Sequence, residues 1–127
     1  MKSQDKIITP KATRLGKRLF SAIDKGNMAL ARELVEKGAD VNYQDPKKGS
    51  SPLIRAVARK RGVEFLKLLV QRGASIHYRG PLVGTPLLNA VLANDVEALK
   101  YLVGCGADPM QELPAGYLLN DACAMGF

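Results

Sequence analysis

The sequence predicts an all-α protein, a solenoid of stacked helix–turn–helix units with two complete repeats and partial N- and C-terminal repeats. Three observations indicate this fold class. The triplet at residues 38–40, Gly-Ala-Asp, recurs in similar form at 73–75 and 106–108, at intervals of 35 and 33 residues. Ser51-Pro52-Leu53 recurs as Thr85-Pro86-Leu87. Between these markers the apolar residues follow the spacing of one helix face, in register from unit to unit.

The composition fits one globular domain. The chain has 127 residues, of which 46% are hydrophobic and 24% charged. It contains no apolar run of membrane-spanning length, and its start lacks the apolar stretch of a signal peptide. Two cysteines, Cys105 and Cys123, are too few for a disulfide scaffold. We read them as free thiols in a reducing compartment and expect an intracellular, cytoplasmic protein, with the nucleus or delivery into a host cell as the alternatives.

The first unit begins with one long helix. Thr9-Pro10 has the form of an N-cap followed by proline at the first helical position, and apolar residues then follow helical spacing to Ile23. We predict a helix over roughly 10–24 whose basic outer face caps the stack. Residues 10–44 would form the N-terminal capping repeat, and residues 1–8 a flexible tail.

The following units repeat the same signals. Ser51 and Thr85 are predicted N-caps of the first helices, and Asn27, Gly62 and Asn94-Asp95 restart the chain into the second helices. The second helices should end at three glycines suited to the left-handed conformation: Gly38, Gly73 and Gly106. Their apolar columns include Leu34, Leu69 and Leu102 in one register and Ala31, Leu66 and Leu99 in another. The repeats are expected at 45–78 and 79–111.

The last residues, 112–127, are predicted to be a partial C-terminal repeat. Residues 116–124 match the start of a fourth unit, but the second helix would have no sequence left. Two explanations stay open: a lone final helix that caps the stack, or a truncated piece of a longer solenoid. In either case Leu118, Leu119 and Met125 would be incompletely covered, which favours self-association or a partner at this end.

These residues resemble the ankyrin repeats. The family pattern Gly-x-Thr-Pro-Leu-His-x-Ala is matched by Gly84-Thr85-Pro86-Leu87 with Ala90, and by Gly49-Ser50-Ser51-Pro52-Leu53 with Ala56. The closing pattern Gly-Ala-Asp-Val-Asn stands in full at residues 38–42. The family histidine is replaced in both units, and the similarity covers about residues 15–127. It implies a protein-interaction module: an adaptor, an inhibitor or a targeting domain.

The resemblance also implies a concave binding surface made by loop tips and first helices. The first loop would contribute Tyr43, Asp45, Lys47, Lys48 and Ser50, and the second loop Tyr78, Arg79, Leu82 and Val83. The third loop would contribute Met110, Gln111, Glu112 and Leu113, and the first helices Asp24, Lys25, Ala58, Arg59, Leu92 and Ala93. Tyrosine and arginine are frequent interface anchors. Each tyrosine could equally be a residue that only packs its loop.

The charge distribution suggests what the partner is like. Residues 1–18 carry six basic side chains against one acidic, and residues 45–79 carry nine against two, whereas residues 80–127 carry one basic against five acidic. A protein partner with an acidic rim and an apolar centre would fit the basic middle of the chain. A second basic row, Arg32, Lys67 and Lys100, belongs to the second helices, and we read it as a solvated ladder.

The sequence gives no convincing catalytic set. His77 is the only histidine and lies at the root of a loop, so we expect no enzyme activity, no cofactor, no metal and no small-molecule substrate. A rival hypothesis is a nucleic-acid-binding protein that uses Arg55, Arg59, Lys60 and Arg61 for phosphate contacts, but aromatic residues are sparse and no groove-reading motif is present. Another is a self-assembling repeat unit. The resemblance leaves the setting open between a cytoplasmic regulator and a microbial effector acting in a host cell.

Overall fold

The computed structural model describes residues 9–112, and these form seven helices with one isolated bridge between Gly80 and Gly84 as the only β pairing among them. The predicted all-α class is therefore confirmed. The helices in chain order are α1 (Pro10–Lys25), α2 (Met28–Glu36), α3 (Pro52–Ala58), α4 (Val63–Gln71), α5 (Pro86–Leu92), α6 (Val96–Gly104) and α7 (Pro109–Glu112).

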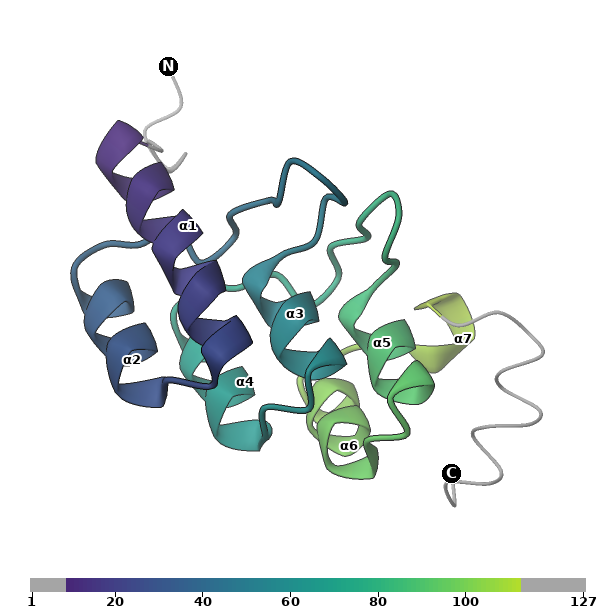
Figure 1. Cartoon of the computed structure of the whole chain (residues 1–127). Helices are drawn as coiled ribbons and strands as arrows, with labels where there is room; N and C mark the ends of the chain where they lie inside the picture. The colour runs from purple at the N-terminus through teal and green to yellow at the C-terminus, as the bar shows by residue number, and fades with distance from the viewer. Residues whose placement is uncertain (1–8, 113–127) are drawn as a thin grey trace.

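The helices form two layers of a short solenoid (Figure 1). In one layer α1, α3 and α5 contact one another in order, and each packs on the following helix of its own unit, α2, α4 or α6. Two long loops, over residues 37–51 and 72–85, project on the same side of the stack as the N-terminal ends of α3 and α5 (Figure 1). This arrangement places the loop tips beside the α1–α3–α5 layer.

Side-chain caps fix where the first helices begin. Thr9, Ser51 and Thr85 each accept a backbone N–H three residues ahead through the hydroxyl oxygen, at 3.0, 3.2 and 3.1 Å. Proline follows each cap, where its missing N–H costs nothing. The predicted N-caps are confirmed, and α1 ends one residue beyond the predicted helix. Glycines with positive φ follow the ends of α2, α4 and α6 as predicted: Gly38, Gly73 and Gly106.

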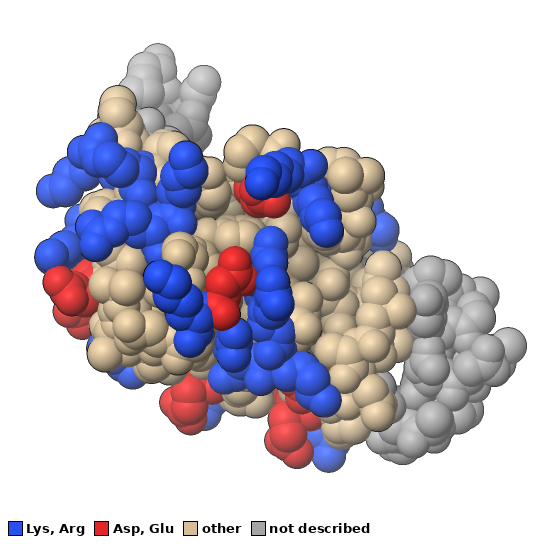
Figure 2. Space-filling view, viewed as in Figure 1, with Lys and Arg blue, Asp and Glu red and all other residues tan. Residues whose placement is uncertain are grey.

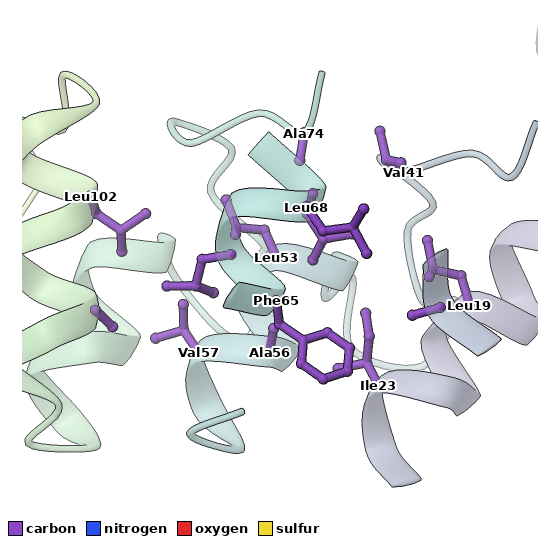
Figure 3. Close-up of a cluster of buried hydrophobic side chains, with 14 of the residues drawn as sticks. Leu19, Ile23, Val41, Leu53, Ala56, Val57, Phe65, Leu68, Ala74 and Leu102 are labelled. Atoms are coloured by element: carbon purple, nitrogen blue, oxygen red, sulfur yellow. The ribbon is translucent and has the colours of Figure 1, made fainter. Parts of the chain in front are cut away.

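The predicted apolar columns form the core. Leu34, Leu69 and Leu102 are each at most 1% exposed, and the column of Ala31, Leu66 and Leu99 is at most 2% exposed. Figure 3 shows Leu19 and Ile23 of α1 and Leu53 and Val57 of α3 pointing into the same interior. Each helix pair therefore covers the apolar face of its neighbour, which is how a solenoid without a central core is stabilised.

A polar contact also joins the first two units. The side chain of Asn42 donates from Nδ2 to the Gly73 carbonyl at 3.0 Å and accepts from the Ser75 backbone N–H on Oδ1 at 2.8 Å. Both partners lie in the loop that follows α4. One amide therefore ties together two loops of successive repeats through main-chain atoms.

The structure corrects the third loop. We expected residues 110–113 to be a loop tip, but α7 begins at Pro109. The Asp108 carboxylate accepts the Met110 N–H at 2.9 Å, and the backbone carbonyl of Asp108 accepts the Gln111 N–H at 3.0 Å. Asp108-Pro109 is therefore another cap followed by proline, outside the register of the repeats. The predicted tail at 1–8 and most of the predicted partial repeat, residues 113–127, lie outside the described residues.

Among residues 9–112, none of the helices is long and apolar enough to cross a lipid bilayer.

Candidate functional site

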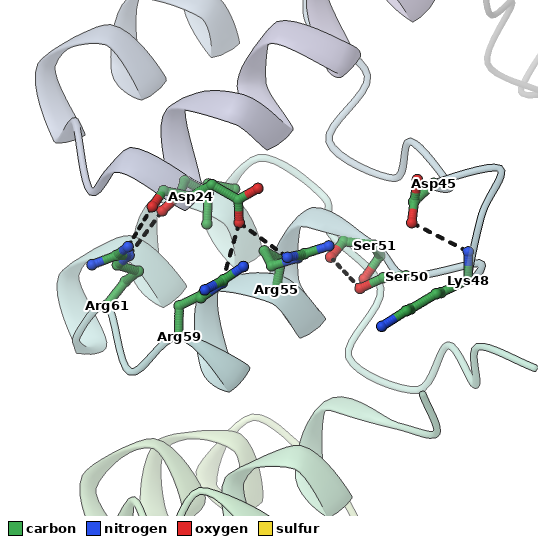
Figure 4. Close-up of polar contacts among 9 residues, drawn as sticks. Asp24, Asp45, Lys48, Ser50, Ser51, Arg55, Arg59 and Arg61 are labelled. Atoms are coloured by element: carbon green, nitrogen blue, oxygen red, sulfur yellow. Dashed lines mark hydrogen bonds and ion pairs between the residues drawn. The ribbon is translucent and has the colours of Figure 1, made fainter. Parts of the chain in front are cut away.

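The first loop is a turn organised by Asp45. Its backbone N–H donates to the Ser50 carbonyl at 2.8 Å, and its carboxylate accepts the N–H groups of Lys47 and Lys48 at 3.4 and 3.2 Å. Figure 4 shows the Asp45–Lys48 contact at the edge of the loop. Both lysines are exposed. Asp45 is thus committed to shaping the loop, while the two lysines present their charges to solvent.

The second loop rests on the first. The Tyr78 hydroxyl donates to the Gly49 carbonyl at 2.6 Å, and Pro81 lies against Gly49 so closely that a Cβ there would come within 2.6 Å of the proline Cδ. Gly49 also has a φ of +72°, which favours glycine. Tyr78 therefore serves the packing of the loops, and its ring remains half-buried at their junction.

Tyr43 holds the first loop against α1. A Cβ at Gly16 would come within 2.9 Å of the Tyr43 Cβ, so the loop approaches the helix at a glycine. The Tyr43 ring meets the Phe20 ring nearly edge-on, with centroids 6.1 Å apart and an interplanar angle of 72°. Such edge contacts add to the stabilisation from buried area. Tyr43 remains half-buried, so part of it stays accessible.

The Asp24 carboxylate on α1 pairs with Arg55 of α3 and with Arg59, which follows the last residue of α3. Asp24 Oδ1 lies 3.2 Å from an Nη of Arg55 and 3.3 Å from Nε of Arg59 (Figure 4). The Arg55 guanidinium also lies over the Phe20 ring, 4.7 Å from its centroid, where the π face attracts a cation. Asp24 is 37% exposed and Arg55 21%, so water screens these pairs only in part.

Arg61 closes the same end of α1. It donates from Nε to the Ile23 carbonyl at 2.8 Å and from an Nη to the Asp24 carbonyl. These carbonyls belong to the last turn of α1, whose acceptors need partners from outside the helix and favour a positive charge. The residues between α3 and α4 thus hold the C-terminal end of α1 against the second unit.

Two hollows lie on this face. The first, which we call the aromatic hollow, measures about 530 Å³ and lies between α1, α3 and the first loop; its lining includes Lys17, Phe20, Tyr43, Lys47 and Arg55. The second, the arginine hollow, measures about 310 Å³ and lies between α3 and α5; its lining includes Lys48, Arg55, Ala58, Arg59 and Val83. Arg55 lines both, so the two hollows meet at its side chain.

The structure brings together some of the predicted binding residues and separates others. Tyr43, Asp45 and Lys47 line the aromatic hollow, and Lys48, Arg59 and Val83 line the arginine hollow. Tyr78 and Leu82 line a groove between the two loop tips, together with both lysines. Two predicted residues line none of these spaces: Arg79, which is exposed in the second loop, and Met110 in α7, to which Glu112 also belongs. The side chain of Glu112 lies outside the described part.

The sequence prediction of the surface missed Phe20 and Arg55. Arg55 precedes Arg59, the C-cap residue of α3, by one helical turn, so both side chains leave the same side of the helix. That spacing was a signal, but the prediction weighed Arg55 only as a phosphate contact. Phe20 reads in the sequence as an ordinary core residue, and it is only 8% exposed.

The charges on this face are uneven. Figure 2 shows lysine and arginine side chains over α1, the first loop and α3, with a few acidic side chains among them, whereas the surface over α5 is mostly uncharged. In the described part of the chain, no group of three or more His, Cys, Asp and Glu side chains is arranged to hold a metal ion.

Stacked helix pairs with loops projecting beside one helix layer define a solenoid repeat protein. A family model described as ankyrin repeats (3 copies) matches residues 19–112, which is most of the chain. The protein therefore belongs to the ankyrin-repeat family, as the sequence motifs predicted. A search of curated proteins finds no match to it. Ankyrin repeats are in general protein-interaction modules, and the family is generally non-catalytic.

Proposed function

We propose that this protein is a non-catalytic adaptor, inhibitor or targeting module that binds another protein through the surface formed by its loops and the α1–α3–α5 layer. The observation that carries the proposal is the pair of adjoining hollows, which combine apolar lining with exposed cations. Interfaces commonly place aromatic and arginine anchors at their centre and a polar rim around them. Here Arg55 lies between the hollows and the lysines of the first loop lie around them.

The partner is proposed to carry an acidic rim. Lys17 and Lys47 line the aromatic hollow and Lys48 lines the arginine hollow, and all three are exposed. A surface of this charge speeds encounter with an acidic partner and disfavours a basic one. A cytoplasmic location agrees with Cys105, which is an exposed free thiol.

An affinity capture with two charge-reversed variants tests the surface. One variant carries Lys47→Glu, Lys48→Glu and Arg79→Glu in the loops. Its matched control carries Arg32→Glu, Lys67→Glu and Arg72→Glu, three exposed positions in or just after the second helices, with the same change in net charge. Proteins bound by the wild type should be lost with the loop variant and kept with the control. Equal behaviour of the two variants would overturn the assignment of the surface.

The two alternatives from the sequence are separable with the same protein. Binding to nucleic acid would fall steeply with added salt and be indifferent to base sequence, because it depends on counterion release. Self-assembly would make the sedimentation coefficient rise with protein concentration. A monodisperse monomer that binds no nucleic acid at moderate salt would leave the protein-binding proposal standing.

A further inference from the structure

Arg55 is the most constrained cation on the proposed binding surface. One edge of its guanidinium is paired with Asp24 at 3.2 Å, and its face lies on Phe20, whose ring is in turn fixed by Tyr43. An arginine held on two sides has already lost much of its rotamer freedom. A partner that binds it therefore avoids part of the entropic cost of ordering a long side chain.

The arginine hollow has the chemistry of a carboxylate-binding site. Lys48, Arg55 and Arg59 line it, and none of its lining residues is acidic. Asp24, which borders it from α1, supplies one negative charge to the two arginines, so the cations remain in excess. Guanidinium groups bind carboxylates through paired, charge-assisted hydrogen bonds, which lysine cannot form in the same geometry.

The aromatic hollow next to it is lined by charged side chains of both signs, Asp24 and Asp45 with Lys17, Lys47 and Arg55, around two aromatic rings against which an apolar side chain can pack. Phe20 and Tyr43 form its aromatic part, and its volume of about 530 Å³ exceeds that of the arginine hollow. Apolar side chains gain most of their binding free energy by leaving water for such a surface. The wall shared by the two hollows is Arg55, so a single short segment can reach both.

We propose that the partner is recognised through a short segment that places an aspartate or glutamate carboxylate on Arg55 and Arg59 in the arginine hollow and a neighbouring apolar side chain in the aromatic hollow. This inference rests on the proposed function and names the chemistry of the partner at that surface. Arg55 is the anchor, and Asp24 is the positioning residue that orients both guanidinium groups.

Peptides selected from a random-peptide display library against the full chain provide the probe. The enriched peptides, synthesised with a fluorescent label, are titrated by anisotropy at moderate salt. We expect them to share one acidic residue close to an apolar one. Replacing that acid by its amide, or Arg55 by glutamine, should each weaken binding at least about tenfold, the loss expected for a hydrogen-bonded charge pair. The affinity of the Arg55→Lys variant should lie between those of the wild type and of Arg55→Gln.

The controls separate this effect from general attraction to a basic protein. A scrambled peptide has the same charge and should bind weakly, and the Arg32→Gln variant changes an exposed cation on α2 and should bind like the wild type. Because Arg55 contacts α1, the melting of its variants is followed by circular dichroism. The Arg59→Gln variant gives a second test with less risk to folding, because the Arg59 side chain is 50% exposed.

The outcomes distinguish a failure of the carboxylate site from a failure of the proposed binding surface. Enriched peptides without an acidic residue, or acidic peptides that bind Arg55→Gln and Arg59→Gln as well as wild type, would overturn the carboxylate site. If such peptides still lose binding to the variant with Lys47, Lys48 and Arg79 reversed to glutamate, the proposed surface stands and only its chemistry is wrong. Peptides indifferent to that variant as well would overturn both.

Discussion

Replacing Arg61 should loosen the first unit from the second. The Arg61→Ala change removes two hydrogen bonds from a cation to the carbonyls of Ile23 and Asp24 and uncovers the C-terminal end of α1. Hydrogen bonds to charged groups contribute about 1.5–3 kcal/mol each, and these are only part-buried. We therefore expect a loss of about 2–3 kcal/mol in the free energy of unfolding, which lowers the melting temperature by roughly 8–15 °C in a chain of this size.

Urea denaturation followed by far-ultraviolet circular dichroism measures this loss. Lys60→Ala is the matched control, because Lys60 precedes Arg61 in the same turn and is exposed, and it should stay within about 0.5 kcal/mol of wild type. Arg61→Lys keeps the charge but loses the paired donors, so its free energy of unfolding should lie between those of the wild type and of Arg61→Ala. An Arg61→Ala protein as stable as the Lys60→Ala control would refute the inference that Arg61 holds the C-terminal end of α1 against the second unit.

Two further substitutions test the core and the loops, and a pH titration tests the environment of Tyr101. Leu69→Ala should cost about 2–5 kcal/mol in urea denaturation, because Leu69 is fully buried between units. Gly49→Ala should lower the melting temperature and weaken the Tyr78–Gly49 contact, since a Cβ there meets Pro81 at 2.6 Å with φ at +72°. Burial, with a lesser contribution from Cys105, raises the pKa of Tyr101 to about 12, so its ring carbon signals should still report a phenol at pH 10. The folded state holds this proton more tightly, so the associated stability is present below pH 10 and is lost as the pH rises towards 12.

The fold was predictable because its signals are local and repeated. A hydroxyl followed by proline sets the start of α3 and α5, and a left-handed glycine follows the end of α4 and α6. Each signal acts within a few residues, so it can be read without knowing the tertiary structure. Helix α7 was missed because Asp108-Pro109 gives the same local signal outside the register of the repeats, where the periodicity predicts a loop.

The candidate site was predictable only in part, because its contacts depend on how two units stack. The exposed lysines of the first loop follow from the loop position alone. The pairing of Asp24 with Arg55 and Arg59 requires the C-terminal half of α1 to lie beside α3, and no local pattern sets that alignment. Tyr78 stays a predicted anchor, and its hydroxyl donates a hydrogen bond to the Gly49 carbonyl, a contact between two loops that no local pattern indicates.

The amide of Asn42 has a consequence for how the repeats can change. Its two hydrogen bonds end on the carbonyl of Gly73 and the N–H of Ser75, atoms that every residue other than proline supplies. Substituting the side chain of Ser75 leaves both bonds in place. The side chains in the loop after α4 can therefore change, by mutation or by engineering, while the hydrogen bonds that join the two repeats are preserved.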